Sequence, residues 1–362
     1  MLRKSLYCVV FPCRLHSHDT VMGVCPLSHI QKSCARWLSG LLALAVLALA
    51  PLAAQAKPPE ARSQVSVKKK SSAKAFRPRA AARAEPARAS FGQIYGLHGA
   101  SDALDLRSSV ALVLDQDTNE VLFSKNPQAV LPIASITKLM TALVVAEAGQ
   151  ALDEPLTISA ADIDTEKGSR SRLQIGTRLS REQMLHLALM ASENRAANAL
   201  GRHYPGGLTA FVAAMNAKAQ TLGMNDTRYV EPTGLSSRNQ SSATDLAALV
   251  REVDKHPLIR SLSTSPEFAI SVGTRHLQFR NTNGLVRSGD WDIGVQKTGY
   301  IAEAGRCLVM QAQLSGRKLI MVLLDSAGKY SRVGDAERIR RWLSVVALDR
   351  IPAAAATVVP LI

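Results

Sequence analysis

Hydrophobic and polar residues follow regular patterns only after about residue 90 of the 362-residue chain. Strand-like alternation covers residues 108–114 and 120–125, and the turn-forming residues 115–119 between them predict a hairpin. Apolar residues spaced three or four positions apart then predict helices. These helices are expected over residues 135–148, 180–191, 194–203, 209–222 and 243–253. Ser180, followed three residues later by Gln183, forms a capping-box signal at the start of the second one.

The last third of the chain changes to the pattern of short strands. Strands are expected over residues 267–272, 275–280, 291–297, 306–314 and 318–324, and a closing helix over 335–348. A hairpin at the start, helices in the middle and most strands at the end indicate an α+β fold. Distant parts of the chain would then complete one antiparallel sheet flanked by helices, in a single domain over residues 91–350.

The N-terminal segment has the pattern of an export signal. Residues 37–52 form an apolar run that follows two basic residues and precedes the small-x-small sequence at residues 54–56. We therefore expect a secretory signal peptide over residues 1–56, with Met22 as a possible true start because the charged region is long. An uncleaved anchor helix is the alternative, which Pro51 disfavours because it breaks a short span.

The net charge of +15 is concentrated outside the expected domain. Residues 57–90 hold ten Lys or Arg and two Glu, and the first 56 residues carry a net +4, so only +3 remains for the rest. This distribution argues against a nucleic-acid partner and favours a basic disordered linker. Attraction to anionic headgroups or wall polymers is the alternative, giving at most peripheral membrane contact. Residues 351–362 form a short Ala- and Pro-rich tail.

Cysteine usage excludes a disulfide framework in the exported part. Four of the five cysteines precede the expected cleavage site, which leaves Cys307 alone. One cysteine can build neither a disulfide nor a thiolate metal site. Because Cys307 lies in an apolar run, we expect it in the core.

Ser135 and Lys138 are the first candidates for chemistry. They stand three residues apart where a turn runs into an apolar helix, which places a hydroxyl and an amine on one face. A serine needs a base to become a good nucleophile, and a buried neutral lysine can serve. The same S-x-x-K pattern starts at Ser66 and Ser71 in the linker and at Ser326 after a strand, where no helix would align the pair.

Two further motifs give this pair its partners. The sequence S-E-N, with Ser192 and Asn194, falls at the break between two predicted helices, where side chains can project into a cleft. The sequence K-T-G, at Lys297, Thr298 and Gly299, falls at the end of an apolar strand. A strand edge offers backbone groups to an extended peptide, and glycine permits its close approach.

In the order S-x-x-K, S-x-N and K-T-G, these motifs resemble those of the penicillin-binding proteins and serine β-lactamases. The sequences P-T-G-L at residues 232–235, N-T-N-G-L at 281–285 and K-T-G-Y at 297–300 extend the resemblance to the D-alanyl-D-alanine carboxypeptidase family. Within it, the chain is most similar to the small DD-endopeptidases, penicillin-binding proteins 7 and 8. The resemblance covers roughly residues 95–348 and implies an α/β/α sandwich with a mostly helical subdomain.

The resemblance also implies roles for the motif residues. Ser135 would be the acylated nucleophile, Lys138 its general base, and Ser192 a proton relay toward the leaving amine. Asn194 would hold the substrate amide, and Lys297 would bind the region of the substrate carboxylate.

The rest of the site follows from the same resemblance. Thr298 and Gly299 would form the substrate-binding strand edge, and backbone N–H groups of Ser135 and Tyr300 the oxyanion hole. We expect no metal and no cofactor. The expected partners are peptidoglycan stem peptides, with β-lactam antibiotics as covalent inhibitors, and the expected location is the periplasm.

Four activities remain open at this point. We favour a D-alanyl-D-alanine endopeptidase that cuts cross-links, because of the closer likeness and because the chain ends soon after the last predicted helix. The alternatives are a carboxypeptidase that trims pentapeptides, a class A-like β-lactamase and an inactive wall-binding module. A class A β-lactamase needs a second carboxylate, and Glu231-Pro232 resembles its glutamate-proline element. That element has an asparagine four residues after the glutamate, where this chain has Leu235. Arg332 is a further candidate for binding a carboxylate, but no motif aligns it.

Overall fold

A five-stranded antiparallel sheet forms the centre of the fold. The computed structural model describes residues 88–349. The strands lie in the order β2-β1-β11-β10-β9, so that the first two strands continue a sheet built by the last three. Their bounds are β1 Ser108–Asp115, β2 Val121–Lys125, β9 Asp292–Ile301, β10 Gly305–Leu314 and β11 Arg317–Ser326.

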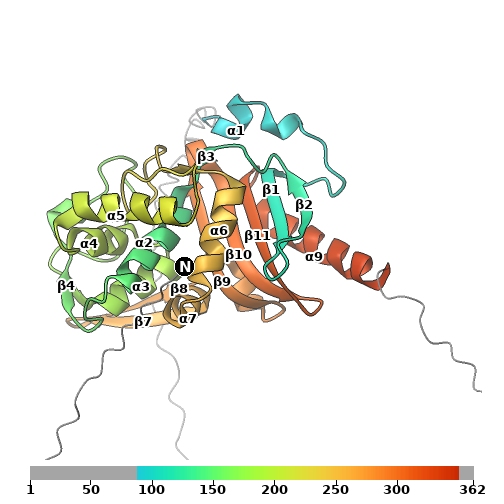
Figure 1. The fold of residues 1–362 in the computed structure, drawn as a ribbon. Coiled ribbons are helices and arrows are strands. Elements are labelled where there is room, and N and C mark those ends of the chain that lie inside the picture. The colour runs from blue at the N-terminus through green and yellow to red at the C-terminus, as the bar shows by residue number, and fades with distance from the viewer. Residues whose placement is uncertain (1–87, 350–362) are drawn as a thin grey trace, which may run out of the picture. The chain divides into compact units, whose positions relative to one another are not determined.

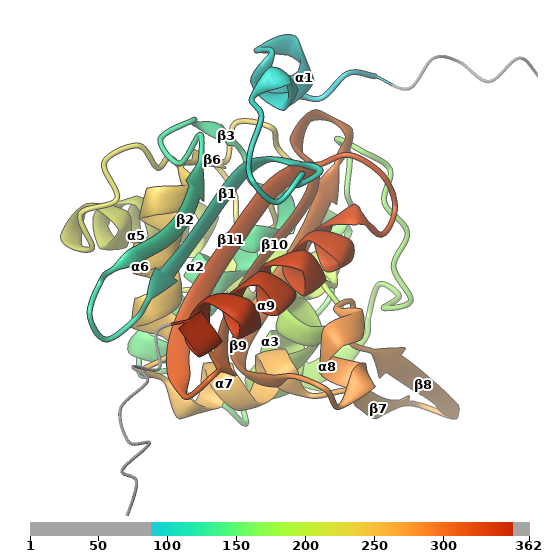
Figure 2. The ribbon, with the colours of Figure 1, turned by 90° about the vertical axis from the view of Figure 1, so that its right-hand side faces the viewer.

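Both faces of the sheet are covered by helices, which explains why the sequences of its central strands are almost continuous apolar runs. Every residue of β1 is buried. Because neighbouring side chains of a strand point to opposite faces, Val110 and Leu112 join one hydrophobic core while Ala111 and Val113 join another. Figure 2 shows helix α9 (Ser331–Asp349) lying across the face of the second core.

The other face of the sheet meets the helical part of the molecule (Figure 1). Its main helices are α2 Thr137–Glu147, α3 Arg181–Met190, α4 Asn194–Arg202, α5 Gly207–Thr221, α6 Ala243–Val253 and α7 Pro257–Thr264. Helix α2 is buried over nine of its eleven residues, so it lies at the centre of this part. A helix that is apolar on all sides is typical of such a position.

Short elements connect these layers. The helices are α1 Phe91–Ile94 and α8 Gly284–Ser288, and the 3₁₀ turns are η1 Leu97–Gly99, η2 Ala134–Ile136, η3 Ala160–Asp162 and η4 Ala302–Ala304. Three two-stranded ribbons pair β3 Leu131–Pro132 with β6 Gln240–Ser241, β4 Pro155–Thr157 with β5 Arg178–Ser180, and β7 Glu267–Val272 with β8 Arg275–Arg280.

Two buried carboxylates fasten the ends of the sheet. Asp335 of α9 accepts hydrogen bonds from the backbone N–H groups of Arg107 and Ser108, at 3.0 and 2.8 Å, and so ties the helix to the start of β1. Asp325 of β11 accepts hydrogen bonds from the hydroxyls of Ser90 and Ser109 at 2.9 and 3.2 Å. The segment before β1 is thereby held against the sheet.

The expected α+β arrangement is confirmed, with corrections to individual elements. Ser135 lies in η2 and the helix begins at Thr137, because the turn that holds the serine is tighter than an α-helix. The strand expected to end at Lys297 continues to Ile301, and the residues beyond Lys297 all pair with β10. Helix α9 begins at Ser331, earlier than expected, and α7 was not predicted.

Other expectations concern burial and the ends of the chain. Cys307 is fully buried, as predicted. The expected signal peptide and tail, and nearly all of the expected linker, lie outside the described residues. Within residues 88–349, no helix combines the length and apolar character that crossing a membrane requires.

Candidate active site

Ser135 occupies a tightly packed turn between the β3 ribbon and α2. Ala134, just before it, has a φ of 48°, and Gly234 has a φ of +80°. A Cβ on Gly234 would lie only 1.9 Å from the carbonyl oxygen of Ala134. The loop at Gly234 therefore packs against the backbone of the turn that holds Ser135, which limits the positions that Ser135 can take.

Lys138 lies directly behind Ser135 on the first turn of α2. Its side chain is fully buried, and its Nζ contacts Ser135 Oγ at 2.8 Å, Asn194 Oδ1 at 2.8 Å and the carbonyl oxygen of Thr233 at 2.6 Å. Burial lowers the pKa of Lys138 from 10.5 to about 7, against the opposing charges of nearby glutamates. Near neutral pH, a large share of Lys138 is thus unprotonated and can accept a proton.

Ser192 faces this pair from the break between α3 and α4. Its φ of 61° is unusual for a residue with a side chain and marks the sharp change of direction between the helices. Lys297 Nζ donates a hydrogen bond to Ser192 Oγ at 3.0 Å and another to the carbonyl oxygen of Thr298 at 2.9 Å. Burial, with the charges of Lys138 and Arg332, lowers the pKa of Lys297 well below its ordinary value.

Asn194 connects Lys138 to a loop that the motifs did not reveal. While its Oδ1 accepts from Lys138, its Nδ2 donates to Ser169 Oγ at 2.9 Å. Both ends of the amide are therefore engaged, which fixes its orientation. The helical break that positions Ser192 also places Asn194 at the first residue of α4.

Strand β9 forms the opposite wall of the site and is an edge strand of the sheet. It pairs with β10 alone, where Gly299 faces Cys307. A Cβ on Gly299 would lie 2.9 Å from the carbonyl oxygen of Ile133 and 3.2 Å from the backbone nitrogen of Ser135. Glycine at this position therefore allows β9 to lie close to the turn that holds Ser135.

The side chains around Gly299 complete this wall. Thr298 Oγ1 is 2.7 Å from Thr282 Oγ1. Tyr300 is 56% exposed, and the guanidinium of Arg306 lies 4.4 Å from the centre of its ring. An exposed aromatic ring directly after the glycine is thus available to a ligand bound along the strand.

All the predicted site residues meet at one cleft of about 430 Å³. Six of them line the cleft directly: Ser135, Ser192, Asn194, Thr298, Gly299 and Tyr300. Lys138 and Lys297 lie behind this lining and contact the hydroxyls of Ser135 and Ser192, respectively. Further lining residues were not predicted as part of the site: Lys167, Ser169, Leu235, Thr282, Ile301 and Ala302. Arg332, the candidate that no motif aligned, also lines the cleft. Arg332 lies at the start of α9, and its Nη1 is buried without a hydrogen-bond partner among the described residues.

Comparison with known proteins agrees with this geometry. A family profile described as D-alanyl-D-alanine carboxypeptidase matches residues 98–328. The chain belongs to this peptidase family. The resemblance inferred from the motifs is thereby confirmed.

Individual members of the D-alanyl-D-alanine carboxypeptidase family are also similar over most of their length. A D-alanyl-D-alanine endopeptidase of Pseudomonas aeruginosa is 50% identical over 255 residues, which cover 69% of this chain and 82% of the relative. A D-alanyl-D-alanine endopeptidase of Escherichia coli is 47% identical over 253 residues, with the same coverage.

Solved structures related to this family have the same fold. A D-alanyl-D-alanine carboxypeptidase from Mycobacterium tuberculosis is 26% identical with a TM-score of 0.61, over 68% of this chain and 94% of that one. A point mutant of the Streptomyces K15 DD-transpeptidase is 27% identical with a TM-score of 0.62, over 66% and 98% of the two chains. The predicted fold class is confirmed by these likenesses.

A class A-like β-lactamase would need a second carboxylate, for which Glu231 was the candidate. In the structure, the carboxylate of Glu231 forms hydrogen bonds within its own loop. Its side chain accepts hydrogen bonds from the backbone of Thr233 and Gly234, at 2.5 and 2.7 Å, and from Asn239 Nδ2 at 3.0 Å. These bonds hold the loop that supplies the Thr233 carbonyl to Lys138. Glu231 is thus a loop-forming residue, as the sequence indicated.

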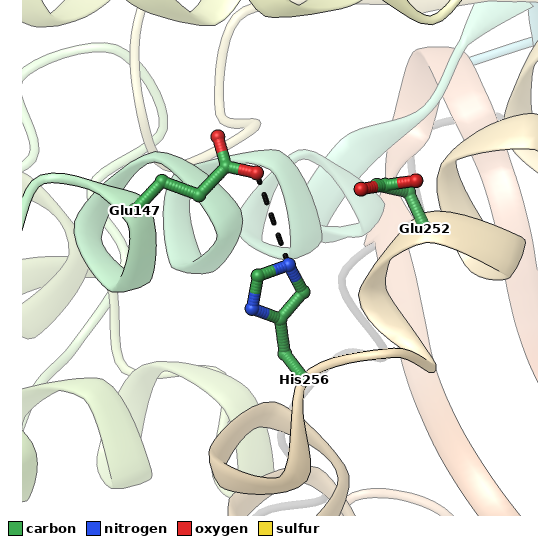
Figure 3. Close-up of side chains that lie close together, drawn as sticks. All are labelled: Glu147, Glu252 and His256. Atoms are coloured by element: carbon green, nitrogen blue, oxygen red, sulfur yellow. Dashed lines mark ion pairs between the residues drawn. The ribbon is translucent and has the colours of Figure 1, made fainter. Parts of the chain in front are cut away.

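Among residues 88–349, one group of side chains has the composition of a metal site, and none of its members lines the cleft. Figure 3 shows Glu147 at the end of α2, Glu252 on α6 and His256 just before α7, with ligand atoms within 4.8 Å of one another. Each carboxylate already pairs with a lysine: Lys218 at 2.6 Å from Glu147, and Lys255 at 2.7 Å from Glu252. The Glu147–Lys218 pair links α2 to α5, whereas the Glu252–Lys255 pair is local to the end of α6.

Proposed function

We propose that this protein is a serine DD-peptidase that cuts D-alanyl cross-links in peptidoglycan through an acyl-enzyme on Ser135. The observation that carries the proposal is the contact of 2.8 Å between Ser135 Oγ and the buried amine of Lys138, whose pKa is about 7. A nucleophile touching a base that is partly unprotonated at neutral pH meets the requirement of covalent catalysis.

In the first step, neutral Lys138 takes the hydroxyl proton of Ser135 while Oγ attacks the carbonyl carbon of a D-alanyl residue. The negative charge that develops on the carbonyl oxygen would be held by the backbone N–H groups of Ser135 and Tyr300. The close approach of Gly299 to Ser135 supports this pairing of donors. Such a donor contributes about 3 to 4 kcal/mol to the transition state.

In the second step, the C–N bond breaks and the leaving amine needs a proton. Ser192 is placed to pass its own proton to the amine and to regain one from the Lys138 side, since Lys297 fixes its Oγ from behind at 3.0 Å. Water then attacks the ester on Ser135 by the reverse sequence, with Lys138 again as base. The products are a free carboxylate, the amine and the regenerated hydroxyl.

The substrate would lie along the free edge of β9 as an added strand. Lys297 and Thr298 would face the carboxylate on the leaving-group side, and Arg332 adds a guanidinium with an unpartnered Nη1 to the same cleft. Asn194 would orient the substrate amide, because both ends of its side chain are already fixed.

Endopeptidase and carboxypeptidase activities share this chemistry and differ in the leaving amine. The relatives at 50% and 47% identity are named endopeptidases, which supports cleavage of cross-linked peptides. Purified cross-linked dimers and pentapeptide monomers should be digested in parallel, with Ser135→Ala as the control. Faster loss of dimers supports the endopeptidase; exclusive release of terminal D-alanine would make the enzyme a carboxypeptidase, and no product from either would leave a binding module.

Penicillin should acylate Ser135 and remain attached, because Glu231 is committed to its loop and supplies no base for hydrolysis. A labelled penicillin is expected to give a long-lived band that is lost in Ser135→Ala. Rapid turnover of the antibiotic would instead identify a β-lactamase. We place the enzyme in the periplasm, exported by the N-terminal signal peptide, with its basic linker as a tether.

A further inference from the structure

A loop over residues 163–172 forms a compact turn at one end of the cleft. The carboxylate of Asp164 accepts hydrogen bonds from the backbone N–H groups of Glu166, Lys167 and Ser169, at 2.8, 2.9 and 2.7 Å. These three bonds explain why Lys167 and Ser169 both lie in the cleft lining. The loop is thus a built part of the site.

Side-chain hydrogen bonds fasten this loop to the helical wall of the cleft. Ser169 Oγ accepts from Asn194 Nδ2 at 2.9 Å, and Ser171 Oγ donates to Glu193 Oε2 at 2.7 Å. The loop is therefore attached to two consecutive residues of the S-x-N motif.

An ion pair fastens the same loop to the opposite wall. Lys167 Nζ lies 2.6 Å from Glu303 Oε1, and Glu303 belongs to η4, the turn directly after β9. The two side chains are 29% and 11% exposed, so the pair is partly shielded from water. The Lys167–Glu303 pair consequently bridges the end of the cleft between its two walls.

Glu303 can release Lys167 without losing all of its cationic partners. Arg88 Nη1 lies 3.4 Å from Glu303 Oε1, and its side chain is 77% exposed and free to move closer. Glu303 Oε2 is buried and has no hydrogen-bond partner among the described residues, so it can take a second donor. Exchange of Lys167 for Arg88 on Glu303 would leave this carboxylate paired.

The direction of the bound peptide decides what meets Lys167. With its carboxyl end at Lys297 and its scissile carbonyl at Ser135, the peptide runs past Ile301 and Ala302, which line the cleft at the end closed by the pair. A carboxylate on the residue before the D-alanyl-D-alanine unit would then compete with Glu303 for Lys167.

We propose that Lys167 determines specificity by exchanging Glu303 for a side-chain carboxylate on the residue that precedes the D-alanyl-D-alanine unit. The Lys167–Glu303 ion pair is a gate that an acidic stem peptide opens by offering Lys167 a new carboxylate. A neutral peptide must break the same ion pair and leaves Lys167 without a carboxylate partner. This inference rests on the proposed function and names the substrate class of the same site.

The test compares two synthetic peptides that end in D-alanyl-D-alanine and differ only in a free or amidated side-chain carboxylate at the preceding residue. Lys167→Met should lower the ratio of kcat/KM for the free over the amidated peptide about tenfold, since hydrogen bonds between charged groups are of this strength. Glu303→Gln should raise the ratio, because it removes the competitor for Lys167. Lys329→Met is the matched control, as Lys329 is an exposed lysine outside the cleft lining.

Opposite effects of the two substitutions separate a gate from a structural ion pair. If both variants lose the same activity on both peptides, the pair only supports the fold and the proposal is wrong; an unchanged ratio also overturns it. Digestion of purified cross-linked dimers by the unaltered enzyme tests the proposed function independently. Failure to cut the dimers would reject that function and the gate with it, whereas failure to cleave either peptide while the dimers are cut would overturn the gate alone.

Discussion

The protonation state of Lys138 should control how fast Ser135 is acylated. Its pKa falls from 10.5 to about 7 because the side chain is fully buried. This change corresponds to about 5 kcal/mol against the charged form. Below its pKa, Lys138 carries a proton and cannot accept another from Ser135, so acidification should slow acylation.

The size of the effect follows from this value. With a pKa of about 7, half of Lys138 is neutral at pH 7. About one molecule in a hundred is neutral at pH 5, so the acylation rate should fall about fiftyfold between these pH values. A lysine with the ordinary pKa would instead give a rate that rises about tenfold per pH unit to beyond pH 9.

The assay is the second-order rate constant for labelling by a fluorescent penicillin between pH 5 and pH 9.5, with Ser135→Ala as the blank. Glu193→Gln provides a second perturbation, because the charge of Glu193 raises the pKa of Lys138 while its Oε2 accepts from Ser171. Glutamine keeps an acceptor and removes the charge, so the midpoint should move to lower pH. A flat profile from pH 5 to 7 would refute the role of Lys138 as base, and a rate still rising about tenfold per unit above pH 8 would refute its lowered pKa.

Three substitutions probe other parts of the structure. Gly234→Ala should lower the melting temperature and slow penicillin labelling, since its Cβ would lie 1.9 Å from the Ala134 carbonyl oxygen; unchanged values for both would contradict the observed packing. Ser192→Ala should slow acylation, measured by stopped flow, by about 10²- to 10⁴-fold at an unchanged melting temperature. An acylation rate equal to that of the unaltered enzyme would show that Ser192 is not the proton relay. Asp335→Ala should lower the free energy of unfolding in urea by more than about 2 kcal/mol, because it leaves buried donors unpaired, and a change below 0.5 kcal/mol would count against that anchoring role.

The fold was predictable where periodicity and end signals agreed. Helix α6 and the ribbon strands β7 and β8 have the bounds expected from their patterns, and Ser180 forms the predicted capping box with Gln183. Strand β9 was expected to end too early because its last residues include Gly299 and an exposed tyrosine, which do not continue an apolar run. Pairing with β10 supplies the hydrogen bonds that extend it.

The site was predictable only where the chemistry requires a particular side chain. A nucleophile, a buried amine and a flexible backbone restrict the residue type, so Ser135, Lys138 and Gly299 have recognisable motifs. Thr233 contributes a carbonyl oxygen to Lys138, which any residue could provide, so the sequence P-T-G-L at residues 232–235 supported the resemblance without indicating this contact. Ser169 enters the site because of a loop turn made by backbone N–H groups, and its neighbours resemble ordinary surface residues.

The strand order of the sheet has a consequence for how the protein folds. Strand β1 lies between β2 and β11, so one of its two neighbours emerges about two hundred residues later. Contacts between such distant segments form slowly, and the exposed edge of β1 must be protected from other chains in the meantime. Because the cleft needs both α2 and β9, and β9 is held in the sheet by β10, no fragment ending before β10 should label with penicillin. The active site therefore forms only when the last strands of the sheet are in place.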